Sequence, residues 1–297
     1  MLSFVVLAGV SFVSSGMMLI AGDPVEVMLE GTTTSDADKV ALRHEFGFDR
    51  PFLVQYADFA TGALKGDLGR SLRFHQPALG IVMDRLPATL RLAVAAMLLA
   101  VLVAVPLGIV SASRPNSWVD YGARLLALIG QSVPLYWLGI VLVLLFAVTL
   151  GWFPSAGDLD LKSIVLPAFT LGLYPTARIA RTLRASLLEV LSREYILTAR
   201  GKGLSNLTVL SRHALRNAAL PVLTVVGLQF GALLGGAVVT ETIFAWPGLG
   251  LLSVQAISWR DLPLLRAIVM VAAAMLVTLN LATDVLYAYV DPRIRFS

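Results

Sequence analysis

The stretch Leu92–Ser113 reads LAVAAMLLAVLVAVPLGIVSAS and runs for 22 residues without a charged side chain. A helix needs roughly 20 apolar residues to cross the hydrocarbon core of a bilayer. Three more uncharged tracts are long enough, namely Met1–Gly22, Leu125–Gly157 and Asn217–Thr240. Two shorter ones, Ser163–Ala177 and Ala267–Thr283, are flanked by charges, and flanking Lys and Arg side chains can reach the headgroups. The sequence therefore predicts an all-α integral membrane protein with six transmembrane helices.

The composition supports a membrane protein and excludes several other classes. Hydrophobic residues make up 57% and charged residues 14% of the chain, whereas charged residues are about 25% of soluble proteins. The mean hydropathy is +0.81. Without cysteine no disulfide or thiolate metal site can form, and His44, His75 and His213 stand too far apart in the sequence to predict a metal site. No soluble basic face favours nucleic acid.

Basic residues predict the orientation. Between the fourth and fifth predicted spans lie Arg178, Arg181, Arg184, Arg193, Arg200, Lys202, Arg212 and Arg216, against only Glu189 and Glu194. The positive-inside rule makes this side cytoplasmic. Both termini are then expected in the cytoplasm, and the acid-rich segment 23–87 on the opposite side.

The spans divide the chain into four expected regions. Residues 1–22 form the first transmembrane helix, 23–87 an extracytoplasmic helical segment, 88–290 a core transmembrane domain with a cytoplasmic loop at 182–217, and 291–297 a cytoplasmic tail. Within 23–87, the capping residues 34–36 precede a short helix over Ala37–Phe46, and Pro51 can begin a second helix that runs through Ala63. We expect these two helices to form a small cap between the first and second spans.

The third apolar tract is interrupted by Gly130-Gln131-Ser132-Val133-Pro134. A broken helix at membrane depth is tolerated where it faces protein or a water-filled cavity. A packing kink and a pore-lining break are both consistent with this pattern.

The loop 182–217 has built-in helix signals. Apolar residues recur at helical spacing over Arg181–Ala199, and Gly201 and Gly203 suit a helix end in left-handed geometry. Ser205 can cap a short second helix over Asn206–Arg212. A basic surface loop is one interpretation, but a long loop with its own caps more often holds a partner or a function.

The same loop resembles the cytoplasmic coupling loop of bacterial ABC importer permeases, in the form typical of the dipeptide/oligopeptide/nickel/glutathione branch. The matching residues are Tyr195, Thr198, Ala199, Arg200, Lys202, Gly203 and Leu204, followed by His213, Leu215, Arg216, Asn217, Ala218 and Pro221. Further matches keep the family's order from residue 22 to 295, among them 66–71, 86–90, 241–250, 260–263 and 291–295. One departure is that the broader importer consensus begins Glu-Ala-Ala, where this chain has Leu197, Thr198 and Ala199.

The resemblance implies the type I ABC importer permease fold and half of a translocation pathway for short peptides. It implies a heterodimer with a second homologous permease in the bacterial inner membrane, two ATPase subunits, and an extracytoplasmic solute-binding protein. The same machinery could import nickel chelates, glutathione or opine-like solutes. ATP and Mg would be used by the ATPase subunits, with no cofactor bound by this chain.

Three groups of site residues are expected. The residues that couple to the ATPase are Thr198, Ala199, Arg200, Lys202, Gly203, Leu204, Ser205, Asn206 and Leu207. Pathway or gate candidates are Gln131, Ser132, Pro134, Gln229 and Glu241, although Glu241 can equally cap the turn at Trp246. Candidates for docking the binding protein are Asp67, Arg70, Trp246, Arg260 and Asp261.

Two other function classes are weaker. An intramembrane enzyme should show a pattern such as His-Glu-x-x-His or Gly-x-Ser-x-Gly, and neither these nor a Walker A lysine loop occurs. An ion-driven transporter should show inverted repeats and paired charges at mid-membrane, which the sequence lacks. We therefore expect import to depend on partner ATPases.

Overall fold

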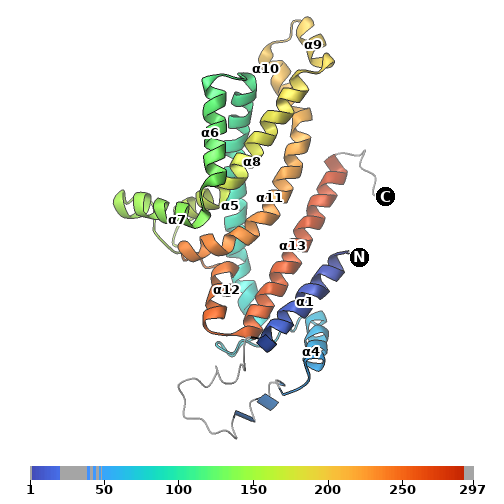
Figure 1. Ribbon diagram of the computed structural model, residues 1–297, viewed down its shortest axis with the longest axis vertical. Coiled ribbons are helices and arrows are strands. Elements are labelled where there is room, and N and C mark those ends of the chain that lie inside the picture. Colours follow the sequence, from blue (N-terminus) through green and yellow to red (C-terminus); the bar gives the residue numbers. More distant parts are fainter. Residues whose placement is uncertain (1, 21–38, 41–42, 45–46, 48, 291–297) are drawn as a thin grey trace. The chain divides into compact units, whose positions relative to one another are not determined.

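The computed structural model describes residues 2–20, 39–40, 43–44, 47 and 49–290. These residues form helices and no strand; two residues, Arg70 and Pro77, make an isolated bridge (Figure 1). The elements are α1 (Leu2–Ile20), α4 (Phe52–Leu64), α5 (Ala78–Ser113), α6 (Trp118–Ser132), α7 (Leu135–Leu142), π-helical η1 (Val143–Thr149), α8 (Val165–Leu191), α9 (Glu194–Gly201), α10 (Asn206–Thr208), π-helical η2 (Val209–Ala214), α11 (Leu215–Ile243), α12 (Leu249–Ser258) and α13 (Leu262–Val290). The predicted all-α fold is confirmed.

Length and composition identify three or four candidate membrane spans among the described residues. In the described part of the chain, three helices are long and apolar enough to cross a bilayer: 78–113, 206–243 and 262–283. The bent pair Trp118–Ser132 and Leu135–Thr149 adds a fourth if it counts as one span. Helix α8 carries Arg178, Arg181 and Arg184 in its second half, which leaves its uncharged part short. The six-span count therefore stays a prediction.

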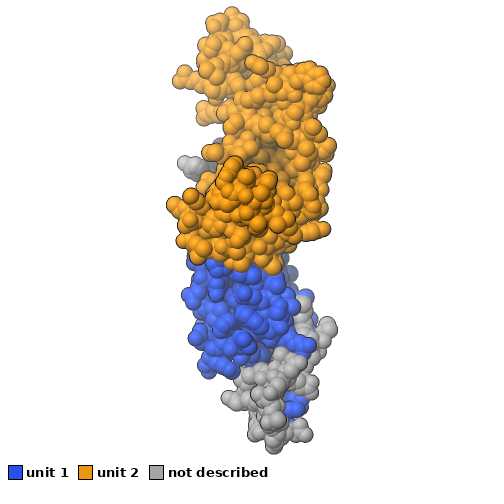
Figure 2. All heavy atoms as spheres, turned by 90° about the vertical axis from the view of Figure 1, so that its left-hand side faces the viewer, with its two compact units in different colours: residues 1–89, 247–278 blue, residues 90–246, 279–297 orange. Residues whose placement is uncertain are grey.

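The chain divides into two compact units (Figure 2). Unit 1 contains residues 1–89 and 247–278, and unit 2 contains 90–246 and 279–297. Helix α12 and the first part of α13 therefore belong to the same compact unit as residues 1–89, and the four regions expected along the chain stay a prediction.

Unit 1 is held together by an apolar cluster and one buried acid. The cluster joins α4, the start of α5, α12 and the start of α13, through residues such as Phe59, Val82 and Leu252. Asp261 is 1% exposed and accepts hydrogen bonds from the Ser71 hydroxyl and from the Arg73 and Leu264 N–H groups. It therefore fastens the 71–73 turn to the first turn of α13.

Helix α4 agrees with the second predicted helix of segment 23–87, with Pro51 directly before it and Gly66 in left-handed geometry after it. The expected helix over 37–46 includes residues 37–38, 41–42 and 45–46, which lie outside the described residues, as do 21–36 and the tail 291–297.

In unit 2, α5 and α8 come close enough for their backbones to touch. A Cβ atom placed on Gly172 would lie 2.7 Å from the Ala96 carbonyl oxygen, and one on Gly108 would lie 3.0 Å from the Ala180 carbonyl oxygen. Small residues allow this approach between membrane helices, where packing rather than the hydrophobic effect drives association. These two glycines set the spacing of α5 and α8.

Candidate functional site

Helix α9 is terminated by a glycine in the left-handed backbone conformation, Gly203. Gly203 has a φ of +79°, its N–H donates to the Arg200 carbonyl at 2.9 Å, and the Leu204 N–H reaches the Ala199 carbonyl at 3.4 Å. These two bonds are the paired bonds of a Schellman motif. Gly203 thus takes the predicted left-handed position, whereas Gly201 is still helical.

Upstream, the helix expected over 181–199 is divided. Helix α8 ends at Leu191, and α9 begins at Glu194. At the break the Ser192 hydroxyl donates to the Glu189 carbonyl at 2.7 Å, and Arg193 pairs with the Glu189 carboxylate at 2.6 Å. The periodicity did not reveal this turn, because apolar spacing continues through it.

Downstream, Ser205 is the predicted cap. Its hydroxyl accepts the Thr208 N–H at 3.3 Å, and α10 begins at the next residue. The expected short helix over 206–212 is not separate, however. Helix α10, η2 and α11 run on as one helix over Asn206–Ile243, because no residue before Pro221 removes a backbone donor and the π-helical turn lets the chain continue.

The predicted coupling residues lie on either side of the helix end at Gly203 and the helix cap at Ser205. All of them are exposed except Ala199, which is 8% exposed and packs inward. Leu207 is 75% exposed. Beside it lies a recess of about 540 Å³, lined by the end of α5, the end of α8, Arg200 and Leu207. The segment presents a preformed, partly apolar surface that could receive a partner.

A side-chain bond fixes α9 to α11. The Asn217 amide donates to the Tyr195 hydroxyl at 2.8 Å, and Ile196 between them in sequence is fully buried. Sequence matching found both residues in the motif but gave them no role. The structure assigns them the task of holding the exposed segment to the long helix.

A second feature is the break between α6 and α7. Helix α6 ends at Ser132, Pro134 precedes α7, and the two helices bend by 103°. By length and composition the bent pair is either a broken span or a re-entrant segment, and a packing kink and a pore-lining break both stay predictions.

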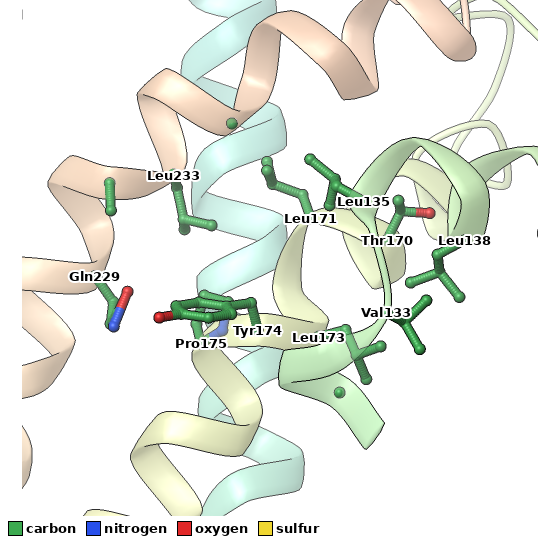
Figure 3. Close-up of a pocket in the computed structure, with 13 residues that line it drawn as sticks. Val133, Leu135, Leu138, Thr170, Leu171, Leu173, Tyr174, Pro175, Gln229 and Leu233 are labelled. Carbon is green, nitrogen blue, oxygen red and sulfur yellow. The ribbon is translucent and has the colours of Figure 1, made fainter. Parts of the chain in front are cut away.

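The break borders a cavity of about 330 Å³ within unit 2 (Figure 3). Its wall is mostly apolar and includes five leucines, with Thr170, Tyr174 and Gln229 as polar members. The Thr170 hydroxyl already donates to the Leu166 carbonyl at 2.8 Å. In Figure 3 the phenol of Tyr174, from α8, points toward the amide of Gln229, from α11. An apolar wall with a few polar groups is typical of small-molecule binding pockets.

One of the five predicted pathway residues lines this cavity, and the other four are not part of its wall. Gln229 lines it and is 6% exposed. Gln131 has a buried Nε2 without a hydrogen-bond partner among the described residues, while Ser132 is exposed and bonds to the Leu128 carbonyl at 2.9 Å. Pro134 begins α7. Glu241 is fully buried, and its backbone carbonyl accepts the Trp246 N–H at 2.8 Å, which agrees with the structural role considered for it.

Tyr174 is the cavity residue that sequence reasoning missed. It precedes Pro175, a proline inside α8. A proline within a predicted span was the available signal, because it frees a backbone carbonyl and often marks a functional bend.

The five docking candidates fall into two kinds. Asp67, Arg70 and Arg260 are exposed, as docking requires. Asp261 is buried in the contacts described above, and Trp246 is 1% exposed with the Arg91 guanidinium 5.6 Å from its ring centre. In the isolated chain the last two are structural anchors, which the sequence motif alone did not distinguish from surface residues.

Comparison with known proteins places these features in a family. Residues 104–296 match the model of the binding-protein-dependent transport system inner membrane component. The chain is 40% identical to a dipeptide transport system permease protein of Alkalihalophilus pseudofirmus, covering 98% of this chain and 96% of that protein. It is 39% identical to an oligopeptide transport system permease protein of Bacillus subtilis, covering 100% and 97%.

Among solved structures, the fold resembles a chain of the methionine ABC transporter MetNI in an inward-facing conformation. The TM-score is 0.60 at 17% identity, covering 71% of this chain and 96% of that chain. At this identity the likeness concerns the fold alone.

Proposed function

This chain belongs to the family of binding-protein-dependent transport system inner membrane components, and from that membership we propose that it imports short peptides as one of two permease subunits. It is a membrane subunit, and ATP hydrolysis resides in separate partner subunits. The proposed cargo rests on one observation: identity of about 40% extends over nearly the whole length of dipeptide and oligopeptide permeases.

The proposed assembly contains a second homologous permease, two ATPases that use ATP and Mg, and an extracytoplasmic binding protein. Both termini and the segment Glu194–Thr208 would face the cytoplasm, as the positive-inside rule predicts. The exposed residues from Thr198 to Leu207 would dock on one ATPase, with Leu207 as the apolar anchor.

Coupling would follow the continuous helix over Asn206–Ile243. One end of that helix begins at the Ser205 cap, and Gln229 further along it lines the cavity. The Tyr195–Asn217 bond makes α9 move with it. An ATPase that displaces the docked segment would therefore displace the cavity wall, which alternating access requires.

The test is uptake by proteoliposomes that contain the assembled importer, with ATP inside and binding protein outside. A labelled tripeptide should accumulate with ATP and should not accumulate when the ATPase subunits are omitted. A nickel chelate, glutathione and an opine serve as alternative cargoes.

The possible outcomes distinguish an error in the proposed transport mechanism from an error in the proposed substrate. Uptake of glutathione, an opine or the chelate in place of the peptide would overturn the proposed cargo but leave the proposed ATP-driven import mechanism in place. Peptide uptake without ATPase subunits would overturn the proposed mechanism itself.

A further inference from the structure

A second cavity of unit 2 lies between α5, α6 and α8, where a buried carboxylate meets several arginines. Its volume is about 330 Å³, and its apolar lining comes from Leu107, Ala127, Leu128 and other small residues. Three guanidinium groups also line it: Arg124, Arg181 and Arg184. Neither the coupling segment nor the cavity near Gln229 uses these residues.

The carboxylate belongs to Asp120, and hydrogen bonds already use its full acceptor capacity. It is 0% exposed and accepts two bonds from Arg184 at 2.7 Å each, one from Arg124 at 3.1 Å, one from the Asn116 N–H at 3.0 Å, and one from the Ser111 hydroxyl. Five donors already exceed the roughly four lone-pair sites of a carboxylate. Asp120 therefore has no capacity left for another cation.

The remaining positive charge is not matched. Three arginines against one aspartate leave two positive charges at the cavity. Arg181 is exposed and has no hydrogen-bond or ion-pair partner within the described part of the chain. Arg124 is 42% exposed at its side chain and uses one N–H on Asp120, so its other donors are also available. The cavity thus offers fork-shaped donors that suit an anion with several oxygens.

The level of the cavity in the bilayer is marked by side chains of α6. Trp118 is 91% exposed and Tyr121 53% exposed in the first turn, and Trp and Tyr gather where membrane meets water. One and two turns further on, Leu125 and Leu128 are 57% and 59% exposed, which suits contact with acyl chains. The arginines therefore stand between headgroup level and hydrocarbon.

We propose that this cavity binds the phosphate of an anionic phospholipid, with Arg181 and Arg124 on the phosphate oxygens and the apolar lining against the first acyl carbons. Basic pockets between membrane helices on the cytoplasmic side recognise lipid headgroups by this chemistry. Asp120 and Arg184 form the fixed wall that orients the site. Free inorganic phosphate has the same oxygens but would leave the apolar lining uncovered.

The test uses the assembled importer and does not depend on its cargo. The importer is offered equal amounts of phosphatidylglycerol and phosphatidylcholine in detergent, and retained lipid is counted by native mass spectrometry. Both lipids carry a phosphate, but the choline cation cancels its charge, so wild type, with two unmatched positive charges at the cavity, should retain phosphatidylglycerol in preference. Arg181→Gln should lower the retained phosphatidylglycerol roughly tenfold, as expected for loss of charge-assisted bonds to phosphate, and Arg181→Lys should restore part of it.

Arg178→Gln is the matched control, because it removes the same charge from the same helix but Arg178 does not line the cavity. The melting temperature of each variant in phosphatidylcholine shows that folding is unchanged. The proposal is overturned if wild type retains the two lipids equally, if Arg178→Gln acts like Arg181→Gln, or if inorganic phosphate at the same concentration as the lipid displaces the phosphatidylglycerol.

Discussion

Replacing Gly203 should lower both peptide uptake and binding-protein-stimulated ATP hydrolysis, through its effect on backbone geometry. A Cβ atom on Gly203 would meet nothing within 4 Å, so side-chain clashes cannot explain an effect. Its φ of +79° is left-handed, where an L-residue costs about 1–2 kcal/mol. If the new residue escapes that region, the Schellman bonds to Arg200 and Ala199 are lost as well, at about 1 kcal/mol each.

The assay is binding-protein-stimulated ATP hydrolysis together with peptide uptake in proteoliposomes. A cost of 1–2 kcal/mol corresponds to roughly a 5- to 30-fold loss of the docked geometry. Gly203→Ala should therefore retain roughly a tenth of uptake, whereas Gly203→Val, a β-branched residue, should abolish both activities. Gly203→Asn should retain more uptake than Gly203→Ala, because Asn tolerates left-handed backbone geometry better than Ala does.

Gly201→Ala is the matched control two residues away. Gly201 ends α9, has ordinary helical geometry, and a Cβ there also meets open space. Alanine should stabilise α9 slightly and leave transport unchanged. Normal uptake with Gly203→Val, or equal effects of the two alanine variants, would refute the role assigned to Gly203.

Three further substitutions test other contacts. Asp120→Asn should destabilise the assembled importer by about 3–5 kcal/mol, because it leaves the partly buried Arg184 without its counter-ion. Thermal unfolding in nanodiscs measures this loss, and an unchanged melting temperature would contradict the prediction. Tyr195→Phe removes the bond from Asn217, about 1 kcal/mol, and should lower stimulated ATPase activity severalfold while assembly, followed by size-exclusion chromatography, stays intact. Gly172→Ala should reduce the folded yield, because its Cβ would lie 2.7 Å from a backbone oxygen of α5. Gly122→Ala is the control and should fold normally, because a Cβ there meets open space. Similar yields of the two variants would show that α5 and α8 can separate.

Local signals in the sequence predicted the parts of the site that short-range chemistry decides. Gly203 and Ser205 ended and began helices where expected, because a left-handed stop and a hydroxyl cap depend on a few neighbouring residues. Pro134 likewise marked the break between α6 and α7.

Contacts between distant segments could not be predicted in this way. Arg184 lies 64 residues from Asp120, and no local pattern joins them. The burial of Trp246 and Asp261 depends on which helices surround them, so a motif match could not separate anchors from surface residues. The continuation of α10 into α11 was missed because a cap marks where a helix starts and says nothing about its length.

The continuous helix over Asn206–Ile243 has a mechanical consequence. Pro221, inside α11, lacks the N–H that would bond to the preceding turn, so the helix bends there most easily. At 1.5 Å per residue the arm from Asn206 to Pro221 is about 22 Å long, and the arm from Pro221 to Gln229 about 12 Å. A helix that bends at Pro221 absorbs part of any displacement of the first arm before that displacement reaches Gln229. The stiffness of the helix at Pro221 therefore sets how much of a movement at Asn206 arrives at the cavity wall beside Gln229.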